Sequence, residues 1–394
     1  MRTTELARDF GTPLIVYCRD TLLACARAYA RVDPAALVVY GTKAFPNVAL
    51  LRLFAAEGLG ADVSTRGELE FALRAGVAPE RVVFHGNNKS DDELRSAAEV
   101  GVLVVLDALD EVELAAAARV RTVLVRVRPG VEAETHRSIQ TAHAESKFGL
   151  APGDALEAVR SARSAGLDVA GLHVHIGSQL ARADESLLAV DRLLEVAHRC
   201  RDELDWHPRV FDLGGGLGVR QSHDETYPEP QDFAGALVGR VRAAWPEPVR
   251  LILEPGRSLV GRAGLTLYRV GIVKPADGVT FVAVDGGMSD NPRPQLYASR
   301  YEALLANRAD EPAARPFRIA GKHCESGDVL IDSVVLPEPR RGDLLAVPAT
   351  GAYTLAMASN YNGVARPAAV LVGDGSAELI RRRETLEDLL RFEE

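Results

Sequence analysis

The sequence predicts a parallel (β/α)₈ barrel of the TIM type, followed by a smaller and mainly antiparallel β domain. Between residues 37 and 254, eight short runs rich in aliphatic residues alternate with stretches whose apolar residues recur at helical spacing. Eight strand–helix repeats are typical of a closed barrel, and a doubly wound open sheet is the alternative. The expected barrel strands are Leu37–Thr42, Ala61–Ser64, Val82–Gly86, Leu103–Asp107, Thr122–Val127, Val169–His175, Val210–Leu213 and Leu251–Glu254.

The helices between these runs are predicted from apolar spacing and from capping residues. Thr65 is followed three residues later by Glu68, and Ser90 is followed in the same way by Glu93. A hydroxyl residue with a glutamate three positions on is the signature of a capping box, so helices should begin at both places. The clearest helical windows are Val48–Glu57, Glu68–Ala75 and Leu187–Cys200.

After Glu254 the pattern changes to short strand-like runs, many of them separated by Gly and Pro turns. Thr12–Tyr17 is also strand-like and could pair with this second domain, whereas Glu378–Glu394 is charged and amphipathic, which predicts a surface helix. The expected organisation is an N-terminal segment in residues 1–30, a barrel in 31–260, and a β domain with a terminal helix in 261–394. The expected strands of the β domain are Leu265–Val273, Val279–Asp285, Phe317–Ile319, Val329–Val335, Asp343–Val347 and Ala368–Val372.

Composition and charge argue against several classes of protein. The 394 residues include 46 basic and 55 acidic side chains, a net charge of −9, which disfavours a generally basic surface for nucleic acid. No apolar run approaches the ~18 residues of a membrane-spanning helix, and the N-terminus lacks the apolar core of a signal peptide. The four cysteines are scattered, without zinc spacing or disulfide density. We expect a cytoplasmic protein with neither a nucleic-acid nor a membrane partner, and without a bound metal.

Ionisable side chains gather where the predicted barrel strands end, which is where barrel enzymes place their active sites. Packing alone does not explain several such residues, so the set predicts a catalytic site. Lys43 is the most informative, because a lysine desolvated at the end of an apolar strand has a lowered pKa and can form an imine with a carbonyl group. The alternative is a barrel lysine whose ammonium reaches solvent. The set comprises Lys43, Asp62, His85, His173, His175, Asp212 and Glu254.

A glycine-rich loop, Asp212–Gly218, follows the predicted seventh strand. Consecutive glycines let backbone amides surround a phosphate, and barrels often bind phosphate near strands seven and eight. The loop matches neither a Walker motif nor a dinucleotide fingerprint, and a flexible loop is the alternative interpretation. In the preceding strand His173 and His175 face the same way; either could be a core residue, and the local spacing supplies no further metal ligand. Gly177 and Ser178 leave room for a ligand beside them.

Three further segments could contribute chemistry. Glu254 ends the eighth strand and could keep a pyridinium nitrogen protonated, or it could form a salt bridge with Arg257. Cys324 stands beside Glu325 and could donate a proton, although a lone cysteine is usually inert. Asp290–Pro294 is a rigid turn that presents Arg293, by default a surface arginine.

Together these segments resemble the fold-type III pyridoxal-phosphate-dependent decarboxylases, from about Gly11 to Val372 and most closely the branch that acts on diaminopimelate. The resemblance implies a pyridoxal 5'-phosphate cofactor and the decarboxylation of meso-2,6-diaminopimelate to L-lysine, the last step of lysine biosynthesis. The alternatives are decarboxylation of ornithine, lysine or arginine, or a non-enzymatic role in binding the cofactor. The matching blocks, in the family's order, are Tyr40–Asn47, Phe84–Ser90, Ser146–Gly149, His173–Gln179, Asp212–Gly218, Glu254–Arg257, Ser289–Pro294, Lys322–Asp328 and Gly351–Asn362.

The same resemblance implies a role for each matched residue. Lys43 is similar to the family's Schiff-base lysine, and Cys324 to its proton donor, so these two are the expected catalytic residues. Cys324 and Glu325 come from the second subunit in this family, which implies a homodimer with shared active sites and a small amino-acid substrate. The expected cofactor-binding residues are Lys43, Asp62, His175 (ring stacking), Ser178, Gly214, Gly215, Gly216, Glu254 (pyridinium), Gly256, Arg257 and Tyr353; the expected substrate-binding residues are Arg257, Arg293, Tyr297, Glu325 and Tyr353.

Overall fold

The computed structural model describes residues 1–131 and 146–394, which divide into two compact units. The barrel unit comprises Leu23–Gly218 and Tyr227–Leu259, and the β unit comprises Met1–Leu22, Val219–Thr226 and Val260–Glu394. One unit contains a closed eight-stranded parallel barrel, and the other contains a nine-stranded, mainly antiparallel sheet. The predicted fold class is therefore confirmed, and the open doubly wound sheet is excluded.

The barrel strands lie where the aliphatic runs predict them, with every end within two residues of its expected position. Each strand pairs in parallel with its neighbours, and the pairing of Leu37 with Ile252 closes the ring between the first and the last strand. Most of the strand side chains are buried, on both faces, as parallel barrel strands require, which explains why the runs are mainly aliphatic. The strands are β2 (Leu37–Gly41), β3 (Gly60–Val63), β4 (Val82–Phe84), β5 (Leu103–Leu106), β6 (Thr122–Val127), β7 (Asp168–Val174), β8 (Val210–Asp212) and β9 (Arg250–Leu253).

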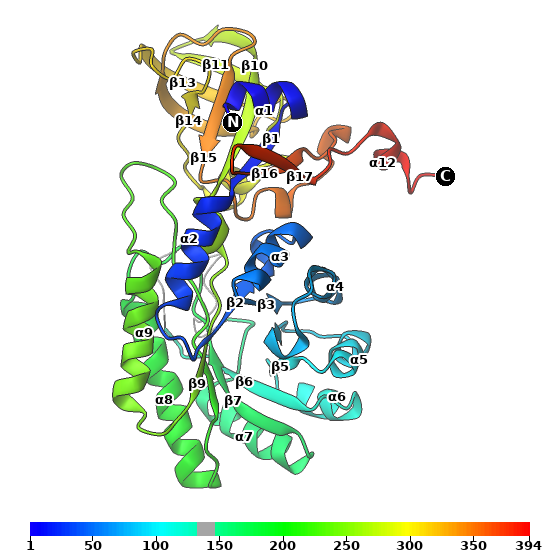
Figure 1. The fold of residues 1–394 in the computed structure, drawn as a ribbon, viewed down its shortest axis with the longest axis vertical. Coiled ribbons are helices and arrows are strands. Elements are labelled where there is room, and N and C mark those ends of the chain that lie inside the picture. The colour runs from blue at the N-terminus through cyan, green and yellow to red at the C-terminus, as the bar shows by residue number, and fades with distance from the viewer. Residues whose placement is uncertain (132–145) are drawn as a thin grey trace. The chain divides into compact units, whose positions relative to one another are not determined.

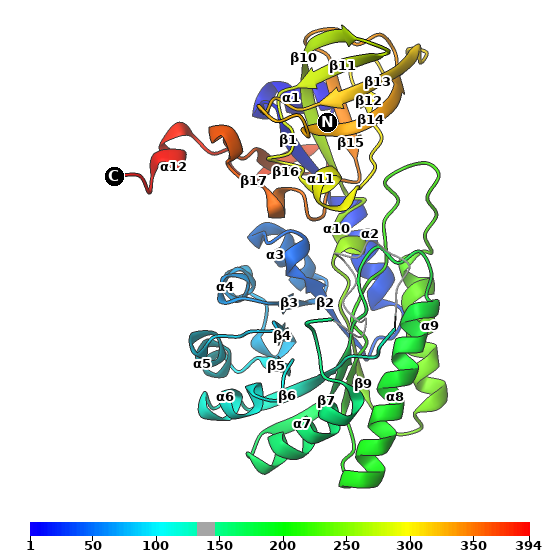
Figure 2. The same cartoon turned by 180° about the vertical axis from the view of Figure 1, so that it is seen from behind.

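The barrel helices lie outside the ring of strands, as the ribbon shows from both sides (Figures 1 and 2). Ser90 and Glu93 form the complete capping box that the sequence predicts. Thr65 caps its helix through the Glu68 N–H, whereas the Glu68 carboxylate accepts from the Ser64 N–H at 2.7 Å, so the box is only half made there. The helices are α2 (Arg19–Ala30), α3 (Val48–Ala56), α4 (Arg66–Ala75), α5 (Asp91–Val100), α6 (Glu111–Ala117), α7 (Pro152–Ser164), α8 (Asp184–Leu204), α9 (Pro230–Ala244) and α10 (Arg257–Val260).

The β unit is built on the strand order β14-β13-β11-β10-β1-β16-β17, with β15 pairing to β10 and β12. The N-terminal strand β1 (Leu14–Cys18) lies between β10, to which it is antiparallel, and β16, to which it is parallel. The short helices α1 (Thr3–Phe10) and α11 (Arg293–Tyr297) also belong to this unit. The other strands are β10 (Gly264–Ala276), β11 (Val279–Val284), β12 (Leu304–Leu305), β13 (Arg315–Ala320), β14 (Val329–Leu336), β15 (Leu344–Pro348), β16 (Ala368–Gly373) and β17 (Ser376–Arg381).

The prediction of a helix over Glu378–Glu394 is wrong for its first part. Ser376–Arg381 forms strand β17 antiparallel to β16, and only Leu386–Leu390 is helical, as α12. The reason is the two-residue turn between the strands, where Asp374 and Gly375 both have positive φ angles, of 51° and 72°. An Asp-Gly pair in this conformation is a strong hairpin signal, and it outweighs the amphipathic pattern that follows it.

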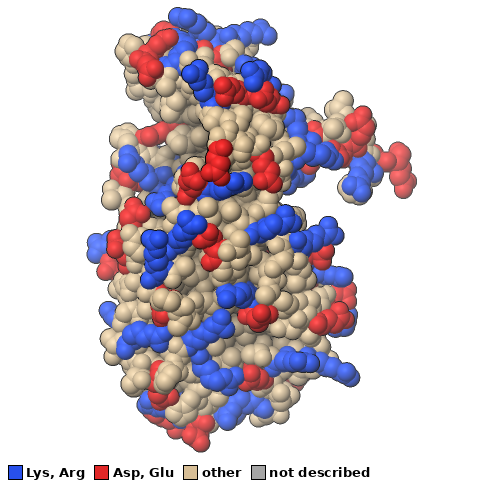
Figure 3. All heavy atoms as spheres, in the orientation of Figure 1, with Lys and Arg blue, Asp and Glu red and all other residues tan. Residues whose placement is uncertain are grey.

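No helix among the described residues is long and apolar enough to cross a membrane. On the face shown in Figure 3, Lys and Arg side chains are interspersed with Asp and Glu, and no single sign of charge covers it.

Candidate active site

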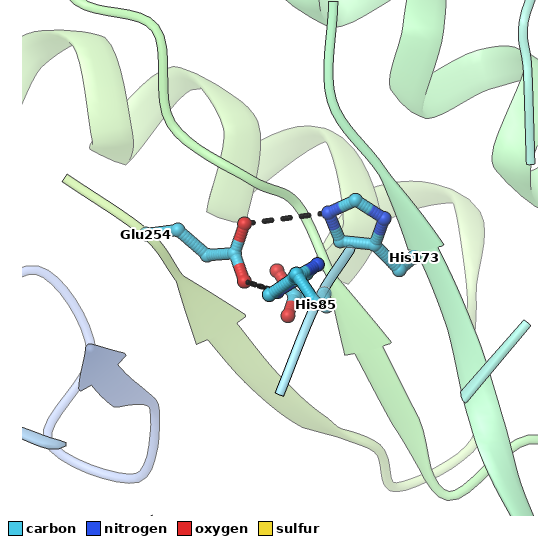
Figure 4. Close-up of side chains that lie close together, drawn as sticks. His85, His173 and Glu254 are labelled. Atoms are coloured by element: carbon cyan, nitrogen blue, oxygen red, sulfur yellow. Dashed lines mark hydrogen bonds and ion pairs between the residues drawn. The ribbon is translucent and has the colours of Figure 1, made fainter. Parts of the chain in front are cut away.

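Glu254, at the end of β9, receives two histidines from other strands (Figure 4). His85 Nε2 lies 2.6 Å from one carboxylate oxygen and His173 Nε2 lies 3.3 Å from the other. The two imidazoles also contact each other edge to face, with ring centroids 4.8 Å apart. Barrel closure makes this cluster, because β4, β7 and β9 all end at the same side of the ring.

The cluster holds Glu254 in its ionised form. Burial alone would raise the pKa of Glu254, but His85 and His173 together lower it well below its usual range. The pKa of neighbouring Asp212 moves the other way, raised well above its usual value by burial and by the charge of Glu254. One oxygen of Asp212 accepts from the Gly214 N–H at 3.0 Å. The site therefore offers one fixed carboxylate charge, supported by hydrogen bonds.

Ligand atoms of His85, His173, Asp212 and Glu254 lie within 4.8 Å of one another. The sequence around His173 contains no carboxylate at metal-ligand spacing. Asp212 and Glu254, which lie on other strand ends, supply the carboxylates instead. By geometry alone the four side chains could hold a metal ion.

Lys43 lies in a short turn, Thr42–Ala44, directly after β2. Its ammonium is 3.9 Å from the carboxylate of Asp62, which is buried at the end of β3 and whose pKa burial raises. The expectation that Lys43 is desolvated is wrong, because its side chain is 52% exposed. The lysine instead extends past the end of its strand, where water reaches it.

The glycine-rich loop has no room for side chains at three consecutive positions. A Cβ atom on Gly215 would lie 2.2 Å from the Glu254 carbonyl oxygen, and one on Gly214 would lie 2.6 Å from the Val174 carbonyl oxygen. A Cβ on Gly216 would lie 2.7 Å from Leu180 Cδ1, and Gly216 also has a φ of 122°. The loop therefore packs its backbone directly against the strand ends, an arrangement suited to holding a phosphate with backbone amides.

His175, Ser178 and Arg257 border this loop. Burial, with a smaller effect of Lys43, lowers the pKa of His175 well below its usual value, and its Nδ1 accepts from the Gly215 N–H at 3.2 Å. Arg257 Nε and Nη2 donate to Ser178 Oγ at 3.2 and 3.1 Å. The backbone at Gly256 passes close to the end of β2, since a Cβ on Gly41 would lie only 3.2 Å from Gly256 Cα. A neutral ring, a hydroxyl and a guanidinium thus lie at the loop.

A cavity of about 310 Å³ opens beside these strand ends within the barrel unit. Arg126 and Phe148 line it, and neither was identified from the sequence as a site residue. The Arg126 guanidinium lies 4.7 Å from the Phe148 ring centroid and donates to Asp107 at 3.2 Å. A charged residue inside the otherwise apolar run Thr122–Val127 was the available signal. The lining residues are Lys43, Asp62, Ser64, His85, Gly86, Asn87, Asn88, Arg126, Phe148, His173, His175 and Glu254.

The remaining expected site residues belong to the β unit and form two groups. Arg293 is not a surface arginine, since it is 2% exposed. Its guanidinium lies 5.0 Å from the ring centroid of Tyr297 and 5.7 Å from that of Tyr353, which brings these three residues together. Cys324 and Glu325 form the second group, on an exposed turn between β13 and β14.

The loop that carries His85 is anchored by a buried ion pair. The Lys89 side chain is 1% exposed, and its Nζ lies 2.8 Å from the Glu111 carboxylate and donates to the Gly86 carbonyl at 2.7 Å. Burial lowers the pKa of Lys89, and Glu111 opposes this shift. The pair connects the segment after β4 to the start of α6.

Lys89→Met should lower the free energy of unfolding by about 3–5 kcal/mol, because it leaves the Glu111 carboxylate buried without its cation. Urea unfolding followed by circular dichroism measures this change. Lys274→Met removes an exposed lysine and should change stability by less than about 0.5 kcal/mol. A Lys89→Met variant as stable as this control would show that the pair does not stabilise the loop.

Comparisons with known proteins identify the family. A family model described as "Pyridoxal-dependent decarboxylase, pyridoxal binding domain" matches residues 19–261. The chain is 47% identical to the diaminopimelate decarboxylase of Actinosynnema pretiosum, an alignment that covers 99% of this chain and 90% of the relative. It is 42% identical to that of Bacillus subtilis, covering 98% of this chain and 92% of the relative.

The chain belongs to the diaminopimelate decarboxylase family. The fold agrees: a crystal structure of diaminopimelate decarboxylase from Helicobacter pylori, complexed with L-lysine, superposes with a TM-score of 0.93. That structure is 31% identical, and the match covers 99% of this chain and 98% of the other. The chain is accordingly a pyridoxal-dependent decarboxylase, a carboxy-lyase, and its cofactor is pyridoxal 5'-phosphate.

The residues of the barrel unit fit this cofactor. The ionised Glu254 suits a protonated ring nitrogen, and the backbone of Gly214–Gly216, closed to any Cβ, suits the phosphate. Asp62 Oδ1 is buried without a hydrogen-bond partner among the described residues, so it could pair with a polar group of the cofactor beside Lys43. Lys43 supplies the amine on the same side of the barrel.

Proposed function

We propose that this chain decarboxylates meso-2,6-diaminopimelate to L-lysine and CO₂, in the cytoplasm and as a homodimer. The observation that carries the proposal is Glu254, held ionised by His85 and His173 at the cavity that Lys43 lines, in a chain 47% identical to a named diaminopimelate decarboxylase. Cofactor binding is assigned to a barrel domain in residues 31–260. Residues 261–394, joined by the N-terminal segment 1–30, supply the β domain.

The bound cofactor supplies the electron sink for the pair released when the bond between Cα and the carboxylate breaks. Lys43 would hold the cofactor through its side-chain amine, the position that the substrate amine would take. Glu254 would hold the ring nitrogen of the cofactor protonated, because its fixed negative charge stabilises the protonated form. Asp62 lies beside Lys43, and His175 would lie against the cofactor ring.

The phosphate is assigned to the backbone of Gly214, Gly215 and Gly216, with Ser178 and Tyr353. Gly256 lets Arg257 approach the same group. On the substrate side, Arg257, Arg293, Tyr297 and Tyr353 bind carboxylates, and Glu325 accepts from the distal ammonium. Fixing both ends of the substrate keeps the reacting carboxylate in one orientation.

The reaction balances with one proton. CO₂ leaves from the D-configured carbon, and the Cys324 thiol donates a proton to Cα. The thiolate then regains a proton from water, and Lys43 releases L-lysine as the product. In the proposed homodimer Cys324 and Glu325 of one subunit complete the site that contains Lys43 of the other.

The test of the substrate is the rate of CO₂ release from meso-diaminopimelate, L-lysine and L-ornithine, measured side by side. We expect meso-diaminopimelate to react at least about 100-fold faster, because a site built for a distal ammonium and carboxylate rejects substrates that lack one of them. A faster rate with L-lysine or L-ornithine would favour a decarboxylase of another basic amino acid. No release from any of the three would favour a cofactor-binding protein.

Cys324→Ala should retain the cofactor but lower the turnover number at least about 100-fold, because it removes a proton donor and leaves the cofactor-binding residues intact. Turnover is measured as CO₂ release, and bound cofactor by absorbance after denaturation. Cys18→Ala, at the end of β1, is the matched control and should keep normal turnover. Unchanged turnover in Cys324→Ala, or loss of the cofactor, would contradict the role.

Mixing Lys43→Ala with Cys324→Ala should restore activity if the sites are shared. After free exchange half of the dimers are heterodimers, each with one site in which both residues are wild type, so recovery should approach about a quarter of wild-type activity. Each variant must be dimeric and inactive alone, and native mass spectrometry confirms the exchange. Verified heterodimers without recovered activity would place both residues in the same subunit's site.

A further inference from the structure

Two residues of the β unit contact three consecutive residues around Cys324. Tyr361 and Asn362 open the short turn Tyr361–Gly363. The Tyr361 ring stacks on the His323 imidazole, with centroids 5.8 Å apart and planes 12° from parallel. The Tyr361 hydroxyl donates to the Glu325 carboxylate at 3.3 Å, and Asn362 Oδ1 accepts from the Cys324 N–H at 2.9 Å. The two residues thus touch His323, Cys324 and Glu325 in turn.

The backbone at Asn362 is adapted to this contact. Its φ of 54° and ψ of 24° lie in the left-handed region, which asparagine adopts more readily than most residues. This conformation directs the amide oxygen to the N–H of Cys324. The Asn362 side chain thereby holds the backbone N–H of the residue that carries the thiol.

The same turn is held from its other side by Asp328. One carboxylate oxygen of Asp328 lies 2.7 Å from His323 Nδ1 and accepts from the His323 N–H at 2.9 Å. Its other oxygen accepts from the Met288 N–H at 2.7 Å. His323 is buried, so it provides a rigid ring against which Tyr361 stacks.

Cys324 and Glu325, by contrast, are exposed at the tip of this turn. An exposed thiol and an exposed glutamate sample many orientations, and each loses entropy when it meets a substrate. Contacts that hold them before the substrate arrives reduce this cost. Tyr361 is 43% exposed, and its hydroxyl contacts Glu325 at the surface of the unit.

We propose that Tyr361 and Asn362 are positioning residues with separate tasks. Asn362 sets the position of the Cys324 thiol for proton donation to Cα. Tyr361 orients the Glu325 carboxylate toward the distal ammonium and thereby contributes to selectivity for a substrate with a charged far end. This inference rests on the proposed function, because it takes the roles of Cys324 and Glu325 from there.

The test separates the two tasks in the holoenzyme with two variants. Tyr361→Phe removes one hydroxyl and keeps the ring stack, so KM for meso-diaminopimelate and the dissociation constant of L-lysine should both rise about fivefold, the loss of one hydrogen bond. Asn362→Gly keeps the left-handed backbone and removes the acceptor, so kcat should fall about tenfold with KM changed less than about twofold. Titration calorimetry with L-lysine measures binding without turnover.

Two further variants exclude a general loss of structure. Asn362→Asp keeps an acceptor at the same position and should retain most of the wild-type kcat. Asn307→Gly removes side-chain contacts elsewhere in the β unit and should leave kcat and KM unchanged. Asn307 Oδ1 accepts from the Leu344 N–H at 2.9 Å, and Asn307 Nδ2 donates to Asp343 at 3.0 Å.

The outcomes distinguish the inference from the function on which it rests. A wild-type enzyme that releases no CO₂ from meso-diaminopimelate would overturn the proposed function and this inference with it. An active wild-type enzyme whose Tyr361→Phe and Asn362→Gly variants change kcat and KM together, or change neither, would overturn the inference alone. Wild-type L-lysine affinity in Tyr361→Phe would also overturn the task assigned to Tyr361.

Discussion

Lys43→Ala is expected to lower CO₂ release on the order of 10⁴-fold or more, because it removes the amine that anchors the cofactor covalently and that releases the product. The carboxylate of Asp62, 3.9 Å from the ammonium, would lose this neighbour and keep His85, whose Nε2 lies 3.8 Å away. The cofactor should still reach the cavity, where Glu254 and the glycine-rich loop are unchanged, but it should no longer become fixed to the protein when borohydride is added.

The measurement combines turnover with mass spectrometry of peptides after borohydride reduction. The chain contains only five lysines, so the attachment site can be identified without ambiguity. Lys274→Ala, at an exposed position on β10, is the control and should keep both activity and the adduct at Lys43. A cofactor adduct at any other lysine of the wild-type protein would refute the assignment.

Glu254→Gln is expected to lower turnover on the order of 10³-fold, which is the scale for removing one preorganised electrostatic contact with the reacting system. The amide has nearly the same shape as the carboxylate but carries no charge. It can therefore neither keep a ring nitrogen protonated nor attract the two histidines that lower the pKa of Glu254. Substrate binding should change little, since the proposed substrate-binding residues remain.

The surface offers a matched control for this variant. Glu247 also pairs with a histidine, His207 Nδ1 at 2.8 Å, but both side chains are exposed. Glu247→Gln should leave turnover within about twofold of the wild type, because an exposed pair contributes little. If Glu254→Gln behaves like Glu247→Gln, the buried charge has no part in catalysis.

The fold class could be predicted because its signals are local. A barrel strand buried on both faces needs an aliphatic run, and each helix start needs its cap, so Leu103–Leu106 and the Ser90–Glu93 box are visible in the sequence. The C-terminal hairpin was equally local, at Asp374-Gly375, but the amphipathic pattern beyond it led to the wrong prediction of a continuous helix.

The candidate site divides in the same way. Its residue types and their order along the chain were determined by the sequence, and they were sufficient to indicate the family. Only the tertiary structure decided that His85 and His173 meet on Glu254, that Arg293 is buried against Tyr297 and Tyr353, and that Lys43 stays half exposed. Each of these outcomes depends on which segments barrel closure and sheet pairing bring together. His173 and Glu254, for example, are 81 residues apart in the sequence. Burial and electrostatic environment arise from those long-range neighbours, and a local pattern carries no information about them.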